Sequence, residues 1–228
     1  MTRKDFDSFS KIVVEELGDK YVLKQPGDPN YIYHFPQLQL KGTAIEPIQT
    51  TDRAQDGIFI DIFILENTPN NYFLRLAHGL ISTFYLFVDS AVRQNECMAH
   101  ISKYIGNNKE AINAVRKRAF IGKVFRFRSL ERWLYVSDKW FGRVKNDKSK
   151  YVSCPTGRLH YFKETYLREQ MCKYCECTFD GYRWSIPLGY DYYLKKRYGN
   201  NYMVIPSKEK REKHLYVKLD FGNSIEDK

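Results

Sequence analysis

The sequence predicts an α+β fold in which a helix and a strand-rich segment come before a helical region and a C-terminal hairpin. Apolar side chains recur at helical spacing in residues 2–17 and again across residues 72–140. Residues 57–65 form an apolar run with isoleucine at every second position, which is the alternation of a strand. Asp180-Gly181 separates two strand-like segments and is a hairpin turn signal. Together these patterns indicate a helix and a mostly antiparallel sheet, followed by further helices.

Composition places the chain among globular proteins with an affinity for anions. Its 228 residues are 43% apolar and unusually rich in tyrosine and phenylalanine. Lys and Arg outnumber Asp and Glu by 37 to 27, which gives a net charge of +10. This charge favours nucleic acid, anionic lipid headgroups, nucleotides or phosphorylated glycans, without choosing among them.

The sequence also indicates a cytoplasmic protein. Its first residues lack the apolar centre of a signal peptide. The longest apolar stretch, residues 72–92, is interrupted by Arg75, His78 and Asp89, so we expect a core or membrane-surface helix and not a spanning one. Five cysteines, an odd number, are expected to be reduced thiols.

The first seventy residues predict one helix and several short strands. Thr2 and Asp5 resemble a capping box at the start of the helix over residues 2–17. After it, we expect strands at the segments 21–23, 31–35, 37–40 and 43–48.

The run from Gly57 to Leu65 predicts a central strand with cover on both faces. Its isoleucines share one face, and Asp61 lies between two phenylalanines on the other. A lone carboxylate in such a place costs free energy unless it meets a cation, a metal or a hydrogen-bond donor. Asp61 therefore either bonds a backbone amide or an arginine, or it has a role in function.

Beyond residue 72 the pattern is helical, with separate helices expected over 109–120 and 129–141. Further on we expect a short helix at 164–169, strands at 172–179 and 182–186, and a helix at 189–198. Basic residues alternate with phenylalanines between the two middle helices: Lys117, Arg118, Phe120, Lys123, Phe125, Arg126, Phe127, Arg128 and Arg132. Such a pattern can bind single-stranded nucleic acid, form a solvated helix face over a core, or face anionic lipid. We do not expect nucleic acid.

Three pieces of the chain, taken in order and spacing, resemble the LicD-type phosphocholine transferases, a family that includes the fukutin-related proteins. The first is Arg3-Lys4-Asp5-Phe6 with Phe9. The second is Gly57-Ile58-Phe59-Ile60-Asp61-Ile62-Phe63, closely followed by Pro69. The third begins at Phe179-Asp180-Gly181-Tyr182 and extends to His214. From this resemblance we expect residues 1–228 to form one LicD-like domain. It would consist of a sheet-bearing half (1–70), a helical region (71–145) and a C-terminal hairpin, helix and basic tail (146–228).

The resemblance implies a nucleotidyltransferase-like mixed sheet with a helical insertion and a small C-terminal hairpin-helix region. It implies an enzyme that moves phosphocholine, or a similar phospho-group, from a CDP-linked donor to a glycan such as lipopolysaccharide or teichoic acid. Such an enzyme uses Mg²⁺ or Mn²⁺ and is cytoplasmic or peripheral on the inner face of the membrane.

The same resemblance makes Asp61 the catalytic carboxylate and metal ligand, and it brings His214 near the site. Lys41 and Arg53 lie near the strands that should approach Asp61, so we expect them to contact the donor phosphates.

The family has a cluster of aspartates just before the helix that here begins at Thr2, and this sequence lacks it. We therefore expect either a truncated form of an active enzyme or an inactive remnant that acts as a binding protein. In both cases the chain alone should have little or no transferase activity. A third alternative, a basic nucleic-acid-binding module, rests on charge alone.

The cysteines offer one further constellation. Cys172, Cys175 and Cys177, with Cys154 and His160 upstream, contain enough ligands for zinc. A second Cys-x-x-Cys pair is missing, so we expect free thiols in preference to a zinc site.

Overall fold

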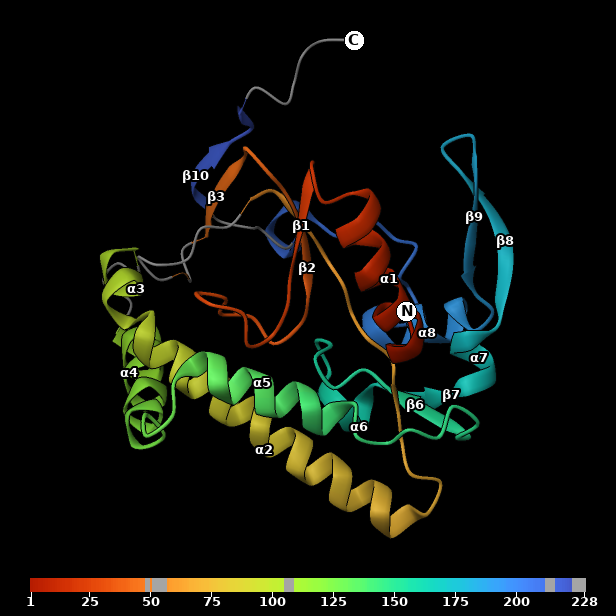
Figure 1. Cartoon of the computed structure of the whole chain (residues 1–228), viewed down its shortest axis with the longest axis horizontal. Coiled ribbons are helices and arrows are strands. Elements are labelled where there is room, and N and C mark those ends of the chain that lie inside the picture. Colours follow the sequence, from red (N-terminus) through yellow and green to blue (C-terminus); the bar gives the residue numbers. More distant parts are fainter. Residues whose placement is uncertain (48–49, 51–56, 105–108, 212–215, 223–228) are drawn as a thin grey trace.

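The computed structural model describes residues 1–47, 50, 57–104, 109–211 and 216–222, and its elements are labelled in Figure 1. Within these residues, eight α-helices and several small antiparallel sheets form an α+β fold, which confirms the predicted class. The helices are α1 (Arg3–Glu16), α2 (Tyr72–Glu96), α3 (Met98–Tyr104), α4 (Lys109–Val124), α5 (Leu130–Phe141), α6 (His160–Lys163), α7 (Arg168–Cys172) and α8 (Tyr190–Tyr198). The strands are β1 (Tyr21–Lys24), β2 (Gln37–Leu40), β3 (Ala44–Pro47), β4 (Phe59–Asp61), β5 (Glu66–Asn67), β6 (Tyr151–Ser153), β7 (Thr165–Leu167), β8 (Tyr174–Phe179), β9 (Tyr182–Pro187) and β10 (Tyr216–Asp220).

Helix α1 begins at the capping box that the sequence predicts. The Thr2 hydroxyl accepts a hydrogen bond from the Asp5 amide over 3.2 Å, and the Asp5 carboxylate accepts one from the Thr2 amide over 3.3 Å. Two backbone donors that a helix start leaves unpaired are thereby satisfied. The apolar side of α1 buries Phe6 against Ile62 and Ile64, so the helix covers one side of the first sheet.

The first sheet has the order β1-β2-β4, with both pairs antiparallel. Strand β4 is three residues long and lies at the edge of this sheet among the described residues, where Ile60 is 68% exposed. The prediction of a central strand covered on both faces is therefore wrong. The chain leaves the sheet after Asp61, and Ile62 and Ile64 pack against α1 outside the strand pairing.

Residues 31–35 form no strand, contrary to the prediction. Instead, the Tyr31 hydroxyl donates to the carbonyl of Phe35 over 2.6 Å, and Ile32 packs into the helical core. Tertiary packing therefore overrides the β propensity of these aromatic residues.

The remaining strands join segments that are distant in sequence. Strand β3 pairs with β10, and β6 lies between β5 and β7.

The predicted helix at 164–169 is wrong, because residues 165–167 pair with β6 and only then does α7 begin. The predicted hairpin is confirmed: β8 and β9 pair around Asp180 and Gly181, which both have positive φ as a type I′ turn requires. This hairpin projects at the right of the molecule in Figure 1.

The helical region packs around the long helix α2. Helices α4 and α5 both lie against it, and the buried core that they share includes Val88, Val92, Leu130, Trp133 and Leu134. At Gly122 the backbone of α4 approaches α2 so closely that a Cβ there would lie 2.0 Å from the carbonyl oxygen of Ala91. No helix in the described part of the chain has both the length and the apolarity needed to cross a membrane.

Candidate functional site at the edge of the first sheet

Asp61 lies at the end of β4, directly opposite Gln37 of β2. Its carboxylate is exposed to solvent and accepts a hydrogen bond from the Gln37 amide over 2.9 Å. The Gln37 side-chain oxygen in turn accepts one from the amide of Gln39 over 3.1 Å. Gln37 is 1% exposed and Gln39 is 2% exposed, so a buried pair of amides positions an accessible carboxylate.

The strand register explains this arrangement. Residues 37, 39 and 61 lie on one face of the sheet, because side chains alternate between faces and Gln37 is paired with Asp61. On the other face, Leu38 packs beneath α1. The sequence pattern singled out Asp61 but neither of the two glutamines. The available signal was the alternation of glutamine and leucine in residues 37–40.

Lys41, Arg53 and His214 are the other predicted site residues. Lys41 follows the opposite end of β2 from Gln37 and donates a hydrogen bond from its exposed ammonium group to the carbonyl of Gly18. The structure therefore places Lys41 at the end of α1 and does not bring it beside Asp61. Arg53 and His214 lie outside the residues that the structure describes.

The first three residues run alongside the segment that follows Asp61. Thr2 and Leu65 form a parallel bridge, and the Leu65 amide donates to the carbonyl of Met1 over 2.8 Å. Arg3, the next residue, reaches the buried carboxylate of Glu66 and also donates to Asp138 over 2.7 Å. This ion-pair cluster ties α1, β5 and α5 together.

The pKa values of this cluster follow from burial and pairing. Burial raises the pKa of Glu66 to about 7, and the guanidinium of Arg3 opposes that rise. Burial opposes charge on Arg3 as well, but the carboxylates of Glu66 and Asp138 outweigh it and raise the pKa of Arg3. Because the guanidinium of Arg3 is paired with both carboxylates, we assign the cluster to stabilisation of the fold and not to ligand binding.

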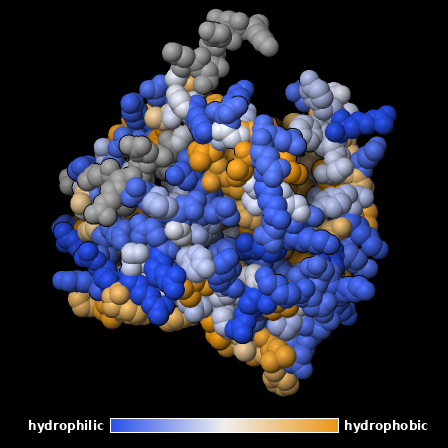
Figure 2. All heavy atoms as spheres, in the orientation of Figure 1, coloured by the Kyte–Doolittle hydropathy of each residue, from blue (hydrophilic) through white to orange (hydrophobic). Residues whose placement is uncertain are grey.

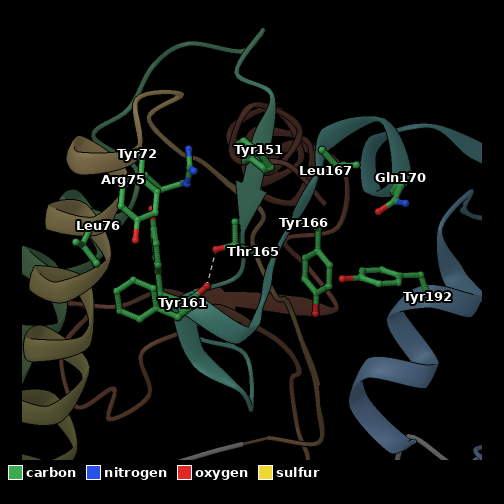
Figure 3. Close-up of a pocket in the computed structure, with 11 residues that line it drawn as sticks. Tyr72, Arg75, Leu76, Tyr151, Tyr161, Thr165, Tyr166, Leu167, Gln170 and Tyr192 are labelled. Carbon is green, nitrogen blue, oxygen red and sulfur yellow. Dashed lines mark hydrogen bonds between the residues drawn. The ribbon is translucent and has the colours of Figure 1, made fainter. Parts of the chain in front are cut away.

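A second candidate binding region is a pocket of about 500 Å³ with five tyrosines among its eleven lining residues, here called the tyrosine pocket (Figure 3). Figure 3 shows that α2 forms one wall, the β6–β7 region the middle and α8 the other wall. Its tyrosines are Tyr72, Tyr151, Tyr161, Tyr166 and Tyr192. The high tyrosine content is visible in the sequence, but this grouping is not, because the five positions are spread over residues 72–192.

Arg75 supplies positive charge to the tyrosine pocket. Its guanidinium lies 4.4 Å from the ring centre of Tyr151 and donates to the carbonyls of Pro69 and Asn70 over 3.0 and 2.9 Å. These contacts hold a cation against an aromatic face. Flat aromatic walls with a fixed guanidinium suit a sugar ring that carries an acidic group, because the rings contact its apolar face and the cation binds its anion.

The cysteines do not gather at one point. Cys154 is buried, and burial raises the pKa of its thiol to about 12. Cys175 and Cys177 lie on one face of β8, Cys172 ends α7, and His160 is exposed at the start of α6. Among the described residues, no three His, Cys, Asp or Glu side chains converge as the ligands of a metal ion.

The lack of such a ligand group among the described residues also applies to the Mg²⁺ site expected at Asp61. Mg²⁺ is commonly held by one or two carboxylates together with waters and substrate phosphates. Asp61 can supply one such ligand, and the described residues do not complete the set.

The chain was compared with protein-family models, with curated proteins and with solved structures, and none of the three comparisons finds a match.

Proposed function

We propose that this protein is a LicD-type phosphotransferase with a nucleotidyltransferase-like fold. It would move phosphocholine or a similar phospho-group from a CDP-linked donor to a cell-surface glycan on the cytoplasmic side of the membrane. The observation that carries the proposal is the exposed carboxylate of Asp61, which buried Gln37 orients at the edge of a sheet.

Asp61 would contribute one ligand to Mg²⁺ or Mn²⁺. When bound, the metal would neutralise charge on the donor's phosphates, which is the main requirement of phosphoryl transfer. The hydrogen bond from Gln37 would hold the carboxylate in one orientation, and the Gln39 amide would fix Gln37 in turn. A single protein carboxylate binds Mg²⁺ weakly, so we expect donor binding with little or no turnover by this chain alone.

The tyrosine pocket would receive the acceptor glycan. Arg75 makes the pocket unfavourable for the trimethylammonium group of choline, since two cations would share one small volume. The same cation favours the phosphate groups that lipopolysaccharide and teichoic acid carry.

Calorimetric titration with CDP-choline, with and without Mg²⁺, tests the donor half of the proposal. We expect Mg²⁺-dependent binding that Asp61→Asn weakens by about tenfold or more, because that variant loses the ligand's charge. The matched control is Asp7→Asn on the exposed side of α1, which should bind as the unaltered chain does. The proposal fails if Mg²⁺ has no effect on binding, or if both variants bind equally well.

The alternative function is a family member without activity that serves as a binding protein. The specific observation in its favour is that the described residues do not complete a metal site. Measurable Mg²⁺-dependent turnover of CDP-choline by this chain would exclude this alternative and would also contradict our expectation of little or no turnover.

A further inference from the structure

Helix α2 exposes a row of large apolar side chains to solvent. Its 25 residues span about 37 Å at the usual rise of an α-helix. One side contributes to the core through Val88 and Val92. Large apolar side chains are exposed from the first turn onward at Tyr72, Phe73, Leu74, Leu76, Leu80, Ile81, Phe84 and Phe87. By helical spacing Leu74 and Ile81 lie on the same side as Val88 and Val92, nearer the start of the helix, and the other six share another side. Figure 2 shows the resulting apolar surface at the lower end of the molecule, where α2 begins.

The end of α4 and the turn after it extend this surface. Phe120 is 71% exposed and Phe127 is 70% exposed, and Val124 between them is also exposed. A second apolar area is visible at the lower left of Figure 2, where α4 ends. The sequence left two main alternatives for this segment, a solvated helix face over a core and a patch facing anionic lipid; the exposure of Phe120 and Phe127 shows that these two rings are not part of a core.

Ring contacts show that the two areas adjoin. Phe125 lies 6.2 Å from Phe84 of α2 and 6.4 Å from Phe127, measured between ring centres. The guanidinium of Arg118 lies 5.8 Å from the ring centre of Phe87. Tyr72 and Leu76 line the tyrosine pocket, so they are left out of this surface. The name docking face is used here for Phe73, Leu74, Leu80, Ile81, Phe84 and Phe87 of α2 together with Phe120, Val124 and Phe127.

Positive charge borders the docking face. Residues 116–132 include seven exposed cations and one acidic residue, Glu131. The cations are Arg116, Lys117, Arg118, Lys123, Arg126, Arg128 and Arg132. A surface that combines protruding apolar groups with a dense basic border is complementary to a membrane whose headgroups are anionic.

The apolar residues of the docking face also favour lipid over nucleic acid as its ligand. Single-stranded nucleic acid gains from aromatic platforms and cations. Four residues of the docking face are aliphatic, namely Leu74, Leu80, Ile81 and Val124, and such side chains offer no stacking face but transfer favourably into an acyl layer. The exposed apolar residues of α2 begin in its first turn, at Phe73 and Leu74, and continue to Phe87.

We propose that the docking face binds the surface of a membrane containing anionic lipids. Helix α2 lies in the interface with its exposed side chains among the acyl chains, and Phe120 and Phe127 insert beside it. The basic residues of 116–132 contact the headgroups. This inference goes beyond the proposed phosphotransfer and does not depend on it.

Flotation with lipid vesicles tests the proposal. Two vesicle types are used: pure phosphatidylcholine, and about three parts phosphatidylcholine to one part phosphatidylglycerol. We expect the full chain to float with the anionic vesicles and much less with the neutral ones, and added salt should weaken the binding. The combined variant Phe120→Ser and Phe127→Ser should reduce the partition coefficient by about tenfold or more. The charge variant Lys123→Glu and Arg126→Glu should reduce it by a similar factor.

The hairpin β8–β9 provides a matched control. Phe179 is 72% exposed, so Phe179→Ser with Arg183→Glu removes an equally exposed ring and one cation from a different surface. This control should bind vesicles as the unaltered chain does. Circular dichroism and the unfolding midpoint establish that each variant is folded, and Leu80→Ser on α2 repeats the test with a single aliphatic residue.

Three outcomes would overturn the proposal. The chain could fail to float with anionic vesicles, the docking-face variants could bind as well as the unaltered chain, or the hairpin control could lose binding to the same degree. Salt-sensitive binding to a single-stranded oligonucleotide without vesicle binding would assign the face to nucleic acid instead. Loss of vesicle binding by Phe120→Ser and Phe127→Ser with unchanged CDP-choline binding would separate the docking face from the Asp61 site.

Discussion

The amide of Gln37 donates a hydrogen bond to the carboxylate of Asp61 across the paired strands β2 and β4, over 2.9 Å. One partner is buried and the other is exposed, so the interior of the sheet sets the orientation of a surface carboxylate. Gln39 continues the same row by donating to Gln37. These contacts make Gln37 the residue on which the geometry of the Asp61 site depends.

Gln37→Met is therefore expected to disturb both ends of this row. Methionine has a similar shape but no amide, so the buried Gln39 amide loses the hydrogen bond that it donates to Gln37, and Asp61 loses the one that it accepts. We expect the free energy of unfolding to fall by about 1–2 kcal/mol in urea titration. Gln94→Met on α2, a half-buried glutamine, is the control and should change stability by less than about 0.5 kcal/mol. Equal losses in the two variants would contradict the role given to Gln37.

Removing the guanidinium of Arg3 should destabilise the fold in a pH-dependent way. Arg3→Met leaves the buried carboxylate of Glu66 without its cation, and we expect a loss of about 3 kcal/mol at pH 8. Burial already raises the pKa of Glu66 to about 7, so this carboxyl is largely protonated at pH 5 and the loss should be smaller there.

Chemical denaturation at the two pH values checks the prediction for Arg3. Lys4→Met, at the adjacent exposed position, should have little effect at either pH. A loss for Arg3→Met that is the same at pH 5 and pH 8 would show that packing, and not charge, explains its effect.

Asp89 should make the protein less stable as the pH rises. It lies on α2 in the helical core, and burial raises the pKa of its carboxyl to about 7, while Ser137 and Arg93 oppose the rise. The folded state therefore holds a proton between about pH 4 and pH 7 that the unfolded state has released. Stability contributed by the protonated carboxyl is present below this window and is lost as the pH rises through it.

Asp89→Asn removes this titration. Relative to the unaltered chain, the variant should gain about 2–4 kcal/mol in the free energy of unfolding between pH 4 and pH 8. Burial, Arg93 and His160 lower the pKa of His34 to about 3, so His34 also contributes to the pH dependence of stability. This contribution is the same in both proteins, so it cancels in the stability difference between them. A stability difference that stays constant over this range would show that Asp89 ionises normally in the folded state.

Gly122→Ala should destabilise the fold although alanine is the better helix former. A Cβ at this position would lie 2.0 Å from the carbonyl oxygen of Ala91, so α4 would have to move away from α2. We expect a loss of about 2 kcal/mol or more, measured as a lower midpoint in thermal or urea unfolding. Lys123→Ala, the next residue on the exposed side, should change stability by less than about 0.5 kcal/mol.

Local sequence patterns were sufficient to predict the elements whose stabilising contacts lie close in sequence. The capping box at Thr2 and Asp5 forms as predicted, and so does the Asp180-Gly181 hairpin. The same kind of pattern failed at residues 31–35, where tertiary packing outweighs strand propensity, and at residues 165–167, where pairing with β6 takes the place of a helix.

The candidate site could be predicted only in part. The alternation in residues 57–65 singled out Asp61 as a carboxylate among apolar neighbours, but it could not identify Gln37 as its partner, because strand register depends on contacts distant in sequence. The tyrosine pocket is likewise assembled from positions between 72 and 192 by the packing of α2, β6, β7 and α8.

The sequence by itself determined the α+β class, the start of α1, the hairpin turn and the excess of positive charge. These follow from local backbone preferences and from composition. The tertiary structure alone decided that β4 lies at the edge of the sheet formed by the described residues, that Asp61 is held by a buried glutamine, and that Phe120 and Phe127 face solvent. Periodicity shows which side chains share a face, but whether that face is covered depends on distant segments, and the sequence pattern does not specify where those segments pack.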